Sequence, residues 1–183
     1  MATSIEICSN ALNLIGHGSI ASFTEGGAGA NIAAALYETT YKDLLSQHRW
    51  RFASAKATLA RLVATPANKW SYAFQLPADY IVAIYVYPNT DYEIYEDKLY
   101  SNMDALDLDY IFKPDESKMP AYFQRVLEFN LAAVFAVAIT DNPSKAEEYR
   151  RMYDTQLRRA RFTDAQARPP RAIVDSPFID VRK

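Results

Sequence analysis

The spacing of apolar residues changes twice along this chain of 183 residues. Before residue 52 and after residue 119, apolar side chains recur at the three- and four-residue intervals of a helix. Between those points lie short segments rich in Tyr, Phe, Ile and Val, separated by turns that contain proline, which is typical of strands. The pattern predicts an α+β fold, mainly α, with a four-helix frame, an inserted antiparallel strand module over about residues 52–112 and an extended C-terminal tail.

Four helices are expected, over residues 4–15, 30–47, 120–140 and 144–166. Thr3 and Glu6 have the spacing of a capping box at the start of the first helix. Asn142 followed by Pro143 is a typical start for the fourth. All five glycines lie between residues 16 and 29, so this stretch is expected to be a connecting loop.

The second helix is expected to stop at the sequence His48-Arg49-Trp50-Arg51-Phe52. Two arginines beyond a helix C-terminus favour its dipole, and two aromatic rings can anchor the exit of the chain. We interpret this cluster as a helix end that packs into the core.

Five strands are expected in the middle of the chain, and Glu96-Asp97 is expected to close a tight hairpin between two of them. Tyr92 and Ile94 alternate with Glu93 and Tyr95, which predicts a sheet with one face in water. Residues 53–63 fit either a strand or a helix. The expected strands are Trp70–Leu76, Tyr80–Tyr87, Tyr92–Tyr95, Lys98–Tyr100 and Leu108–Phe112.

Charge is distributed unevenly although the formal net charge is only -2. Residues 91–116 contain nine acids and two lysines, a net charge of -7, whereas residues 145–171 contain eight bases and four acids, a net charge of +4. The small overall charge argues against wholesale binding to nucleic acid or membranes. The run Leu131–Ile139 is much shorter than the roughly 20 residues that cross a bilayer. A helix this apolar must instead be covered by its own domain or by neighbouring subunits.

Few residues are suited to catalysis or metal binding. The chain has two histidines, His17 and His48, and one cysteine, Cys8, which predicts no metal site and no disulfide within the chain. Cys8 is interpreted as a buried apolar residue and His17 as a solvent-facing loop residue. We expect no cofactor and no enzymatic activity.

The acidic stretch offers the one catalytic alternative, because two carboxylates a few ångströms apart can hydrolyse a glycoside. A solvated sheet face that also discourages edge pairing explains these acids more simply. The residues concerned are Glu93, Glu96, Asp104, Asp107 and Asp109.

The end of the chain differs in composition from the rest. Residues 1–168 are expected to form a single domain, and prolines prevent residues 169–183 from continuing the last helix. The tail nevertheless contains several apolar residues, whose exposure to water would be unfavourable. It is therefore expected to need a partner surface.

The expected elements contain many short pieces of sequence that are individually weak but together extend over nearly the whole chain. They are SNALNLIG at 9–16, Tyr41–Leu45 with HRWRFA at 48–53, TLARL at 58–62, FQLPADYIV at 74–82, YEIYEDKLYS at 92–101, DYIFK at 109–113, LAAVFAVAIT at 131–140 and RRARFTDAQ at 158–166. In this order they resemble the tail tubular protein A family, the head-to-tail adaptors of short-tailed bacteriophages.

The resemblance implies a virion protein of the tail, assembled in the host cytoplasm. Twelve copies would form a ring between the portal protein and a tail nozzle resembling tail tubular protein B, with genomic DNA passing non-specifically through the channel. The C-terminal segment would dock on the portal through Pro169, Pro170, Ile173, Val174, Phe178, Ile179 and Val181.

A ring brings one face of each subunit against a different face of its neighbour, so the opposed charged segments are expected to meet. The expected interface residues are Arg150, Arg158 and Arg161 on one side and Glu93, Asp104 and Asp107 on the other. Two alternatives remain open: a cell-wall glycan hydrolase or glycan-binding tail component, and a head completion connector of a long-tailed phage.

Overall fold

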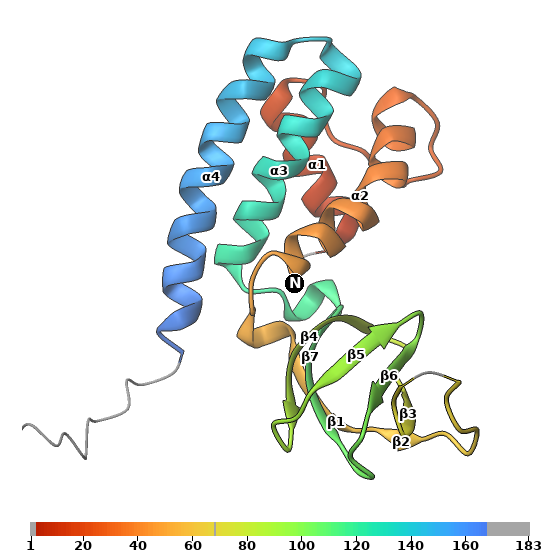
Figure 1. Ribbon diagram of the computed structural model, residues 1–183. Coiled ribbons are helices and arrows are strands. Elements are labelled where there is room, and N and C mark those ends of the chain that lie inside the picture. Colours follow the sequence, from red (N-terminus) through yellow and green to blue (C-terminus); the bar gives the residue numbers. More distant parts are fainter. Residues whose placement is uncertain (1–2, 68, 168–183) are drawn as a thin grey trace, which may run out of the picture.

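The chain is described here from a computed structural model that covers residues 3–67 and 69–167. Within these residues, four helices lie together at one end and a small module of strands lies at the other (Figure 1). The fold is α+β, mainly α, as predicted. We call residues 47–53, which connect the second helix to the first strand, the neck.

The first two helices are α1, Ser4–Ile15, and α2, Ala28–Ser46. The Thr3 hydroxyl accepts a hydrogen bond from the Glu6 N–H at 3.2 Å, and Gly16 ends α1 in the left-handed conformation that glycine adopts easily. The expectation that all five glycines lie in a loop is wrong for Gly29, which is buried in the first turn of α2. A Cβ at Gly29 would lie 2.7 Å from Cε1 of His17, so glycine is needed here for close approach rather than for turning.

The last two helices, α3, Ala121–Thr140, and α4, Pro143–Ala165, form an antiparallel pair. Pro120 caps α3 and is not its first residue, contrary to the prediction. The Asn142 side chain accepts a hydrogen bond from the Lys145 N–H at 3.0 Å and Pro143 follows it, as predicted for the start of α4.

Helix α3 is the centre of the helical core and packs against α1, α2 and α4. Phe123, Leu127 and Leu131 are completely buried. Each such side chain contributes about 1.5–3 kcal/mol through burial. Ala121–Thr140 is long and apolar enough to cross a membrane, but more than half of it is buried inside the fold, as in the core helix of a globular protein. Its own domain therefore covers most of α3, although Val137 near the end remains half exposed.

In the described part of the chain, seven strands form two antiparallel sheets, ordered β1-β7-β4 and β2-β3-β6-β5. The chain passes directly from the first sheet to the second at Leu59, which is buried between β1 and β2. The predicted hairpin is present, with Tyr95 paired to Lys98 and Glu96 at a φ of 55°. The strands are β1 Ser54–Thr58, β2 Ala60–Arg61, β3 Tyr72–Gln75, β4 Tyr80–Tyr87, β5 Tyr92–Tyr95, β6 Lys98–Ser101 and β7 Asp107–Phe112.

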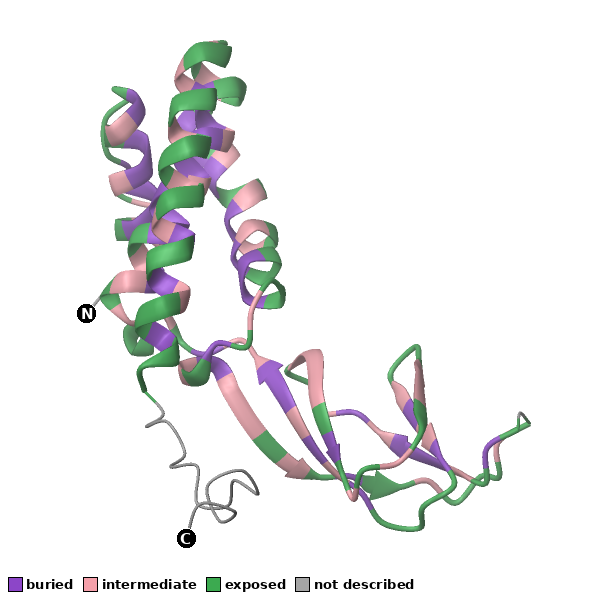
Figure 2. Cartoon of the chain, turned by 60° about the vertical axis from the view of Figure 1, so that its left-hand side comes forward, coloured by how far each residue is buried: buried purple, intermediate pink, exposed green. Residues whose placement is uncertain are grey.

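The strand module has a hydrophobic cluster of its own, in which Phe74, Leu99 and Leu108 are completely buried. Buried residues accordingly gather in both parts of the molecule, whereas most of the outer surface of α4 is exposed (Figure 2). Short 3-10 helices at Arg51–Ala53 and Glu116–Lys118 lie where the chain enters and leaves the module.

Candidate assembly surfaces

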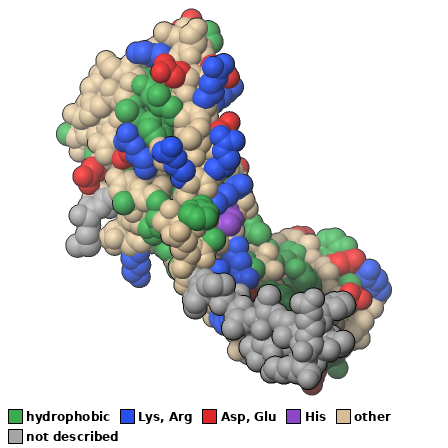
Figure 3. All heavy atoms as spheres, turned by 90° about the vertical axis from the view of Figure 1, so that its left-hand side faces the viewer, with side chains coloured by type: hydrophobic (Ala, Val, Ile, Leu, Met, Phe, Trp, Pro, Cys, Tyr) green, Lys and Arg blue, Asp and Glu red, His purple; other side chains and the backbone are tan. Residues whose placement is uncertain are grey.

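Exposed arginines line the outer side of α4. Figure 3 looks onto this side and shows Lys and Arg side chains from the far end of the helices down to the strand module, with some acids between them. Arg151 pairs with Glu147 at 3.3 Å, but exposed pairs of this kind are weak, so the guanidinium stays available to a partner. Phe162, in the last turns of α4, is 67% exposed. Arginine and exposed aromatic side chains are enriched at protein interfaces. We call Arg150, Arg151, Arg158, Arg159 and Phe162 the basic face.

Arg161 does not belong to this surface, although the sequence predicted it as an interface residue. It is half buried, and its Nη2 donates a hydrogen bond to the carbonyl of Gln47 at 3.1 Å, at the end of α2. A cation at a helix C-terminus complements the dipole of that helix. Arg161 therefore fastens α4 to the neck.

A buried carboxylate completes this attachment. Asp164 is 1% exposed and accepts hydrogen bonds from the Arg51 N–H at 3.1 and 3.2 Å and from the Tyr122 hydroxyl at 2.8 Å. Burial and the bond to Asp164 raise the pKa of Tyr122. A buried carboxylate is stabilised only where donors compensate its lost hydration, and these donors come from the neck and α3. The cluster joins three segments that are distant in sequence.

Sequence reasoning missed Asp164, although one signal was present. An acid in the last turn of a helix opposes the helix dipole, so an unusual partner was to be expected for it. His48 Nε2 lies 3.7 Å from the Asp164 carboxylate. Burial lowers the pKa of His48, Asp164 opposes this effect, and Arg161 and Arg51 reinforce it.

Trp50 holds the neck in the helical core, as predicted for this cluster. It is completely buried, its Nε1 donates to the Leu44 carbonyl at 2.9 Å, and its ring meets Phe123 edge to face at 4.9 Å. The neck is thus a packed connection rather than a loose linker.

Glu93 on β5 was one of the acids predicted either for catalysis or for an interface. Its carboxylate accepts hydrogen bonds from Lys69 Nζ at 2.8 Å, Trp70 Nε1 at 2.7 Å and the Tyr95 hydroxyl at 2.9 Å. These donors, Lys69 first, lower the pKa of Glu93 to about 2. A general acid must hold its proton near the working pH, so Glu93 is unsuited to that role. Its carboxylate instead connects the segment before β3 to β5.

The remaining predicted acids are in different settings. Asp109 lies between Arg49 Nη2 at 3.6 Å and Lys56 Nζ at 3.4 Å, and Asp107 accepts from the Thr58 hydroxyl at 2.6 Å. Asp104 is exposed in the turn between β6 and β7.

Strand pairing places several acids at one end of the module. Tyr87 pairs with Asp107 and Tyr92 pairs with Ser101, so the turns over residues 88–91 and 102–106 lie at the same end. The neck enters at the opposite end of β1. We call Asp91, Asp104 and Asp107 the acidic end.

His17 and Cys8 occupy the environments expected of structural residues. The His17 residue is exposed, with its ring against Gly29, and burial raises the pKa of the Cys8 thiol to about 12. A thiol held in its neutral form is a poor nucleophile. Among residues 3–67 and 69–167, no group of three His, Cys, Asp or Glu side chains is arranged to hold a metal ion.

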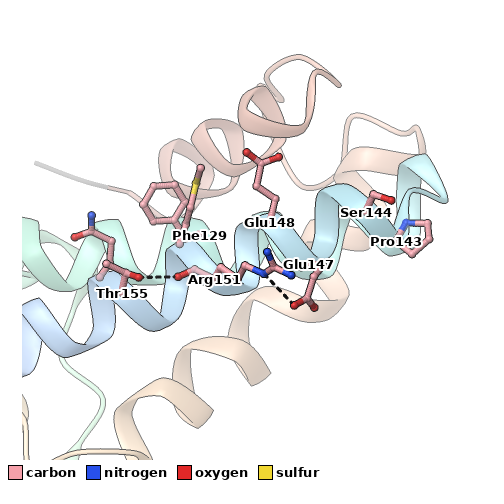
Figure 4. A pocket seen from close by; sticks show the side chains of 9 residues that line it. Phe129, Pro143, Ser144, Glu147, Glu148, Arg151 and Thr155 are labelled. Carbon is pink, nitrogen blue, oxygen red and sulfur yellow. Dashed lines mark hydrogen bonds and ion pairs between the residues drawn. The ribbon is translucent and has the colours of Figure 1, made fainter.

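An open groove of about 1070 Å³ lies along α4, with Phe129 of α3 beside it. Figure 4 shows Phe129 near the middle of the groove, and Glu147 and Glu148 nearer to the end that Pro143 lines. Met152 contributes further apolar surface and is 39% exposed. Sequence reasoning missed this groove, because it depends on how two helices meet.

The predicted portal-docking residues, from Pro169 to Val181, lie outside the described residues. A comparison of the chain with protein-family models finds no match, and a comparison with curated protein sequences finds none. The family assignment accordingly remains a proposal based on the short pieces of sequence given above.

Proposed function

We propose that this chain is a non-enzymatic subunit of the head-to-tail adaptor of a short-tailed bacteriophage. Twelve copies would form a ring between portal and tail nozzle, through which the genomic DNA passes. The resemblance to tail tubular protein A supports the family and the partners. The observation that carries the structural side of the proposal is the placement of opposite charges on two separate parts of one subunit.

The charge placement favours contact between different faces of neighbouring copies. The basic face lies on α4 in the helical part, whereas the acidic end lies on the strand module, remote from the neck. A contact between unlike faces repeats from copy to copy and closes into a ring when the rotation permits. Complementary charge fixes the register of such a contact.

The structure refines the set of interface residues. Arg161 and Glu93 are engaged within the chain, by Gln47 and by Lys69 respectively. Arg150, Arg158 and Asp104 are exposed, and Asp107 accepts a hydrogen bond from the neutral Thr58 hydroxyl, which leaves the acidic end its negative charge. We retain these four residues, and add Arg159 and Phe162 from the basic face.

The packing of the neck supports a role in which the helical part and the strand module keep a fixed orientation to each other. Two pieces of the family resemblance, HRWRFA at 48–53 and RRARFTDAQ at 158–166, meet there through the bond from the Arg51 N–H to Asp164, and Arg161 adds a bond to Gln47 just before the first piece. A ring subunit needs such rigidity because any change in the angle between its two parts alters the closure of the ring.

A charge exchange tests the interface. We expect Arg158→Glu with Arg159→Glu to prevent ring formation on the portal, and Asp104→Arg with Asp107→Arg to do the same, because like charges then face each other. A chain that carries all four substitutions should regain ring formation. Lys118→Glu, an exposed charge reversal outside the basic face and the acidic end, is the control. Normal ring formation by either pair alone, or no recovery in the combined variant, would contradict the proposed contact.

Two results would favour the alternatives. Clearing of purified peptidoglycan by the folded chain would indicate a glycan hydrolase. A ring with a different subunit number and different neighbours, seen by electron microscopy, would indicate a connector of the long-tailed type.

A further inference from the structure

The groove on α4 leaves apolar surface exposed on the described part of the chain. Phe129 is 7% exposed and belongs to the buried set, but Met152 beside it is 39% exposed. Arg151 and Thr155 line the half of the groove nearer the C-terminal end of α4, and Glu147 and Glu148 the other half. An apolar hollow with charged edges is typical of a site for a short peptide segment.

We propose that residues Ile173–Phe178 of the same chain bind in this groove before assembly. The inference rests on the proposed function only for naming the portal as the partner that displaces them. The segment belongs to the 16 residues that follow Ala167, where the described structure ends.

The reach of the chain fits this placement. Ala167 lies eleven positions beyond Gln156, a distance of about 16 Å along a helix, which residues 168–172 span when extended at about 3.3 Å each. The groove then runs from Gln156 to Pro143, about 20 Å along the helix. About six extended residues cover this length, which corresponds to Ile173–Phe178.

The chemistry of the segment fits as well. Ile173, Val174 and Phe178 supply apolar side chains, and Asp175 provides a charge opposite to that of Arg151. Arg182 and Lys183 follow at the end of the chain, beyond the part of the groove that carries Glu147 and Glu148. Attachment to α4 favours binding in the same chain over binding in another, because a short tether gives an effective concentration on the order of millimolar.

A disulfide between Met152→Cys and Val174→Cys tests the placement in the full chain. The native Cys8 is completely buried with a pKa of about 12, so it does not compete. Under mild oxidation we expect a cross-linked monomer. The control pairs Val174→Cys with Ala34→Cys, an exposed position on α2 that does not line the groove. It should cross-link at least about tenfold more slowly, the factor that corresponds to about 1.4 kcal/mol.

Substitutions in the tail provide a second readout. Ile173→Asp in the Met152→Cys, Val174→Cys background should slow cross-linking about tenfold, whereas Val181→Asp, beyond the proposed segment, should have little effect. Cross-linked dimers in place of monomers would show that the groove receives a second copy, and would overturn the proposal. Cross-linking no faster than the control would overturn it too. In either case the proposed function would still be judged by whether the full chain adds mass to portal rings, since that measurement does not involve the groove.

Discussion

Asp164 is the residue on which the attachment of α4 to the neck most depends. Replacement by Ala leaves the Arg51 N–H and the Tyr122 hydroxyl without their acceptor. We expect a loss of about 2–4 kcal/mol in the free energy of unfolding, measured by urea denaturation followed by circular dichroism. Asp154→Ala, an exposed change on the same helix, should stay within about 0.5 kcal/mol.

The Asp164→Asn variant gives a readout that a general loss of stability does not affect. The Asp164 carboxylate opposes the lowering of the His48 pKa, so its neutralisation should lower that pKa further in an NMR titration of the ring. Unchanged titration of His48 together with unchanged stability would contradict the described cluster.

Glu93 makes stability depend on pH in a defined window. Its pKa is about 2 in the folded chain against an ordinary value of 4.5, so its contribution is complete above about pH 4.5 and is lost as the pH falls toward 2. We expect the difference in stability between the wild type and Glu93→Gln to be constant above that window and to shrink within it. Lys69→Met removes the donor that lowers the pKa of Glu93 most, and should move the loss of stability to higher pH. A difference that persists unchanged at pH 2 would contradict this account.

At the scale of elements, the start of α2 depends on the contact between Gly29 and His17. Alanine in place of glycine within a helix ordinarily stabilises by about 1 kcal/mol. We expect that gain for Gly29→Ala only in a His17→Ala background, because a Cβ otherwise lies 2.7 Å from the imidazole. A double-mutant cycle by thermal or urea unfolding measures the coupling. Additive effects on the free energy of unfolding would show that the His17 imidazole moves away from the new Cβ without an energetic cost.

Elements set by local chemistry could be predicted from the sequence, and those set by distant partners could not. Asn142-Pro143 at α4 and the Glu96-Asp97 hairpin act within a few residues, and both are confirmed. Residues 53–63 remained ambiguous because β1 pairs with β7, about 50 residues further along the chain. Gly29 was misassigned because its neighbour His17 comes from another turn of the chain.

At the scale of the whole molecule, the same distinction applies to the candidate surfaces. The exposed arginines of α4 could be predicted from periodicity and charge alone. The hydrogen bond from Arg161 to Gln47 and the one from Lys69 to Glu93 could not be predicted, because these partners come together only when the chain folds. The groove beside Phe129 likewise results from how α3 and α4 pack.

The proposed ring needs each subunit to present its basic face and its acidic end at a fixed separation, which the neck provides. The connection between the two cores meets this requirement because it is itself packed, with Trp50 completely buried and Asp164 hydrogen-bonded from two sides. Loosening of the neck is therefore expected to weaken ring assembly as well as folding.

The most direct test is the mass of the full chain, of portal rings from a short-tailed bacteriophage and of their mixture, measured by size-exclusion chromatography with light scattering. The account predicts that portal rings gain the mass of about twelve subunits of 20.7 kDa each. Portal rings whose mass is unchanged by an excess of folded chain would contradict it.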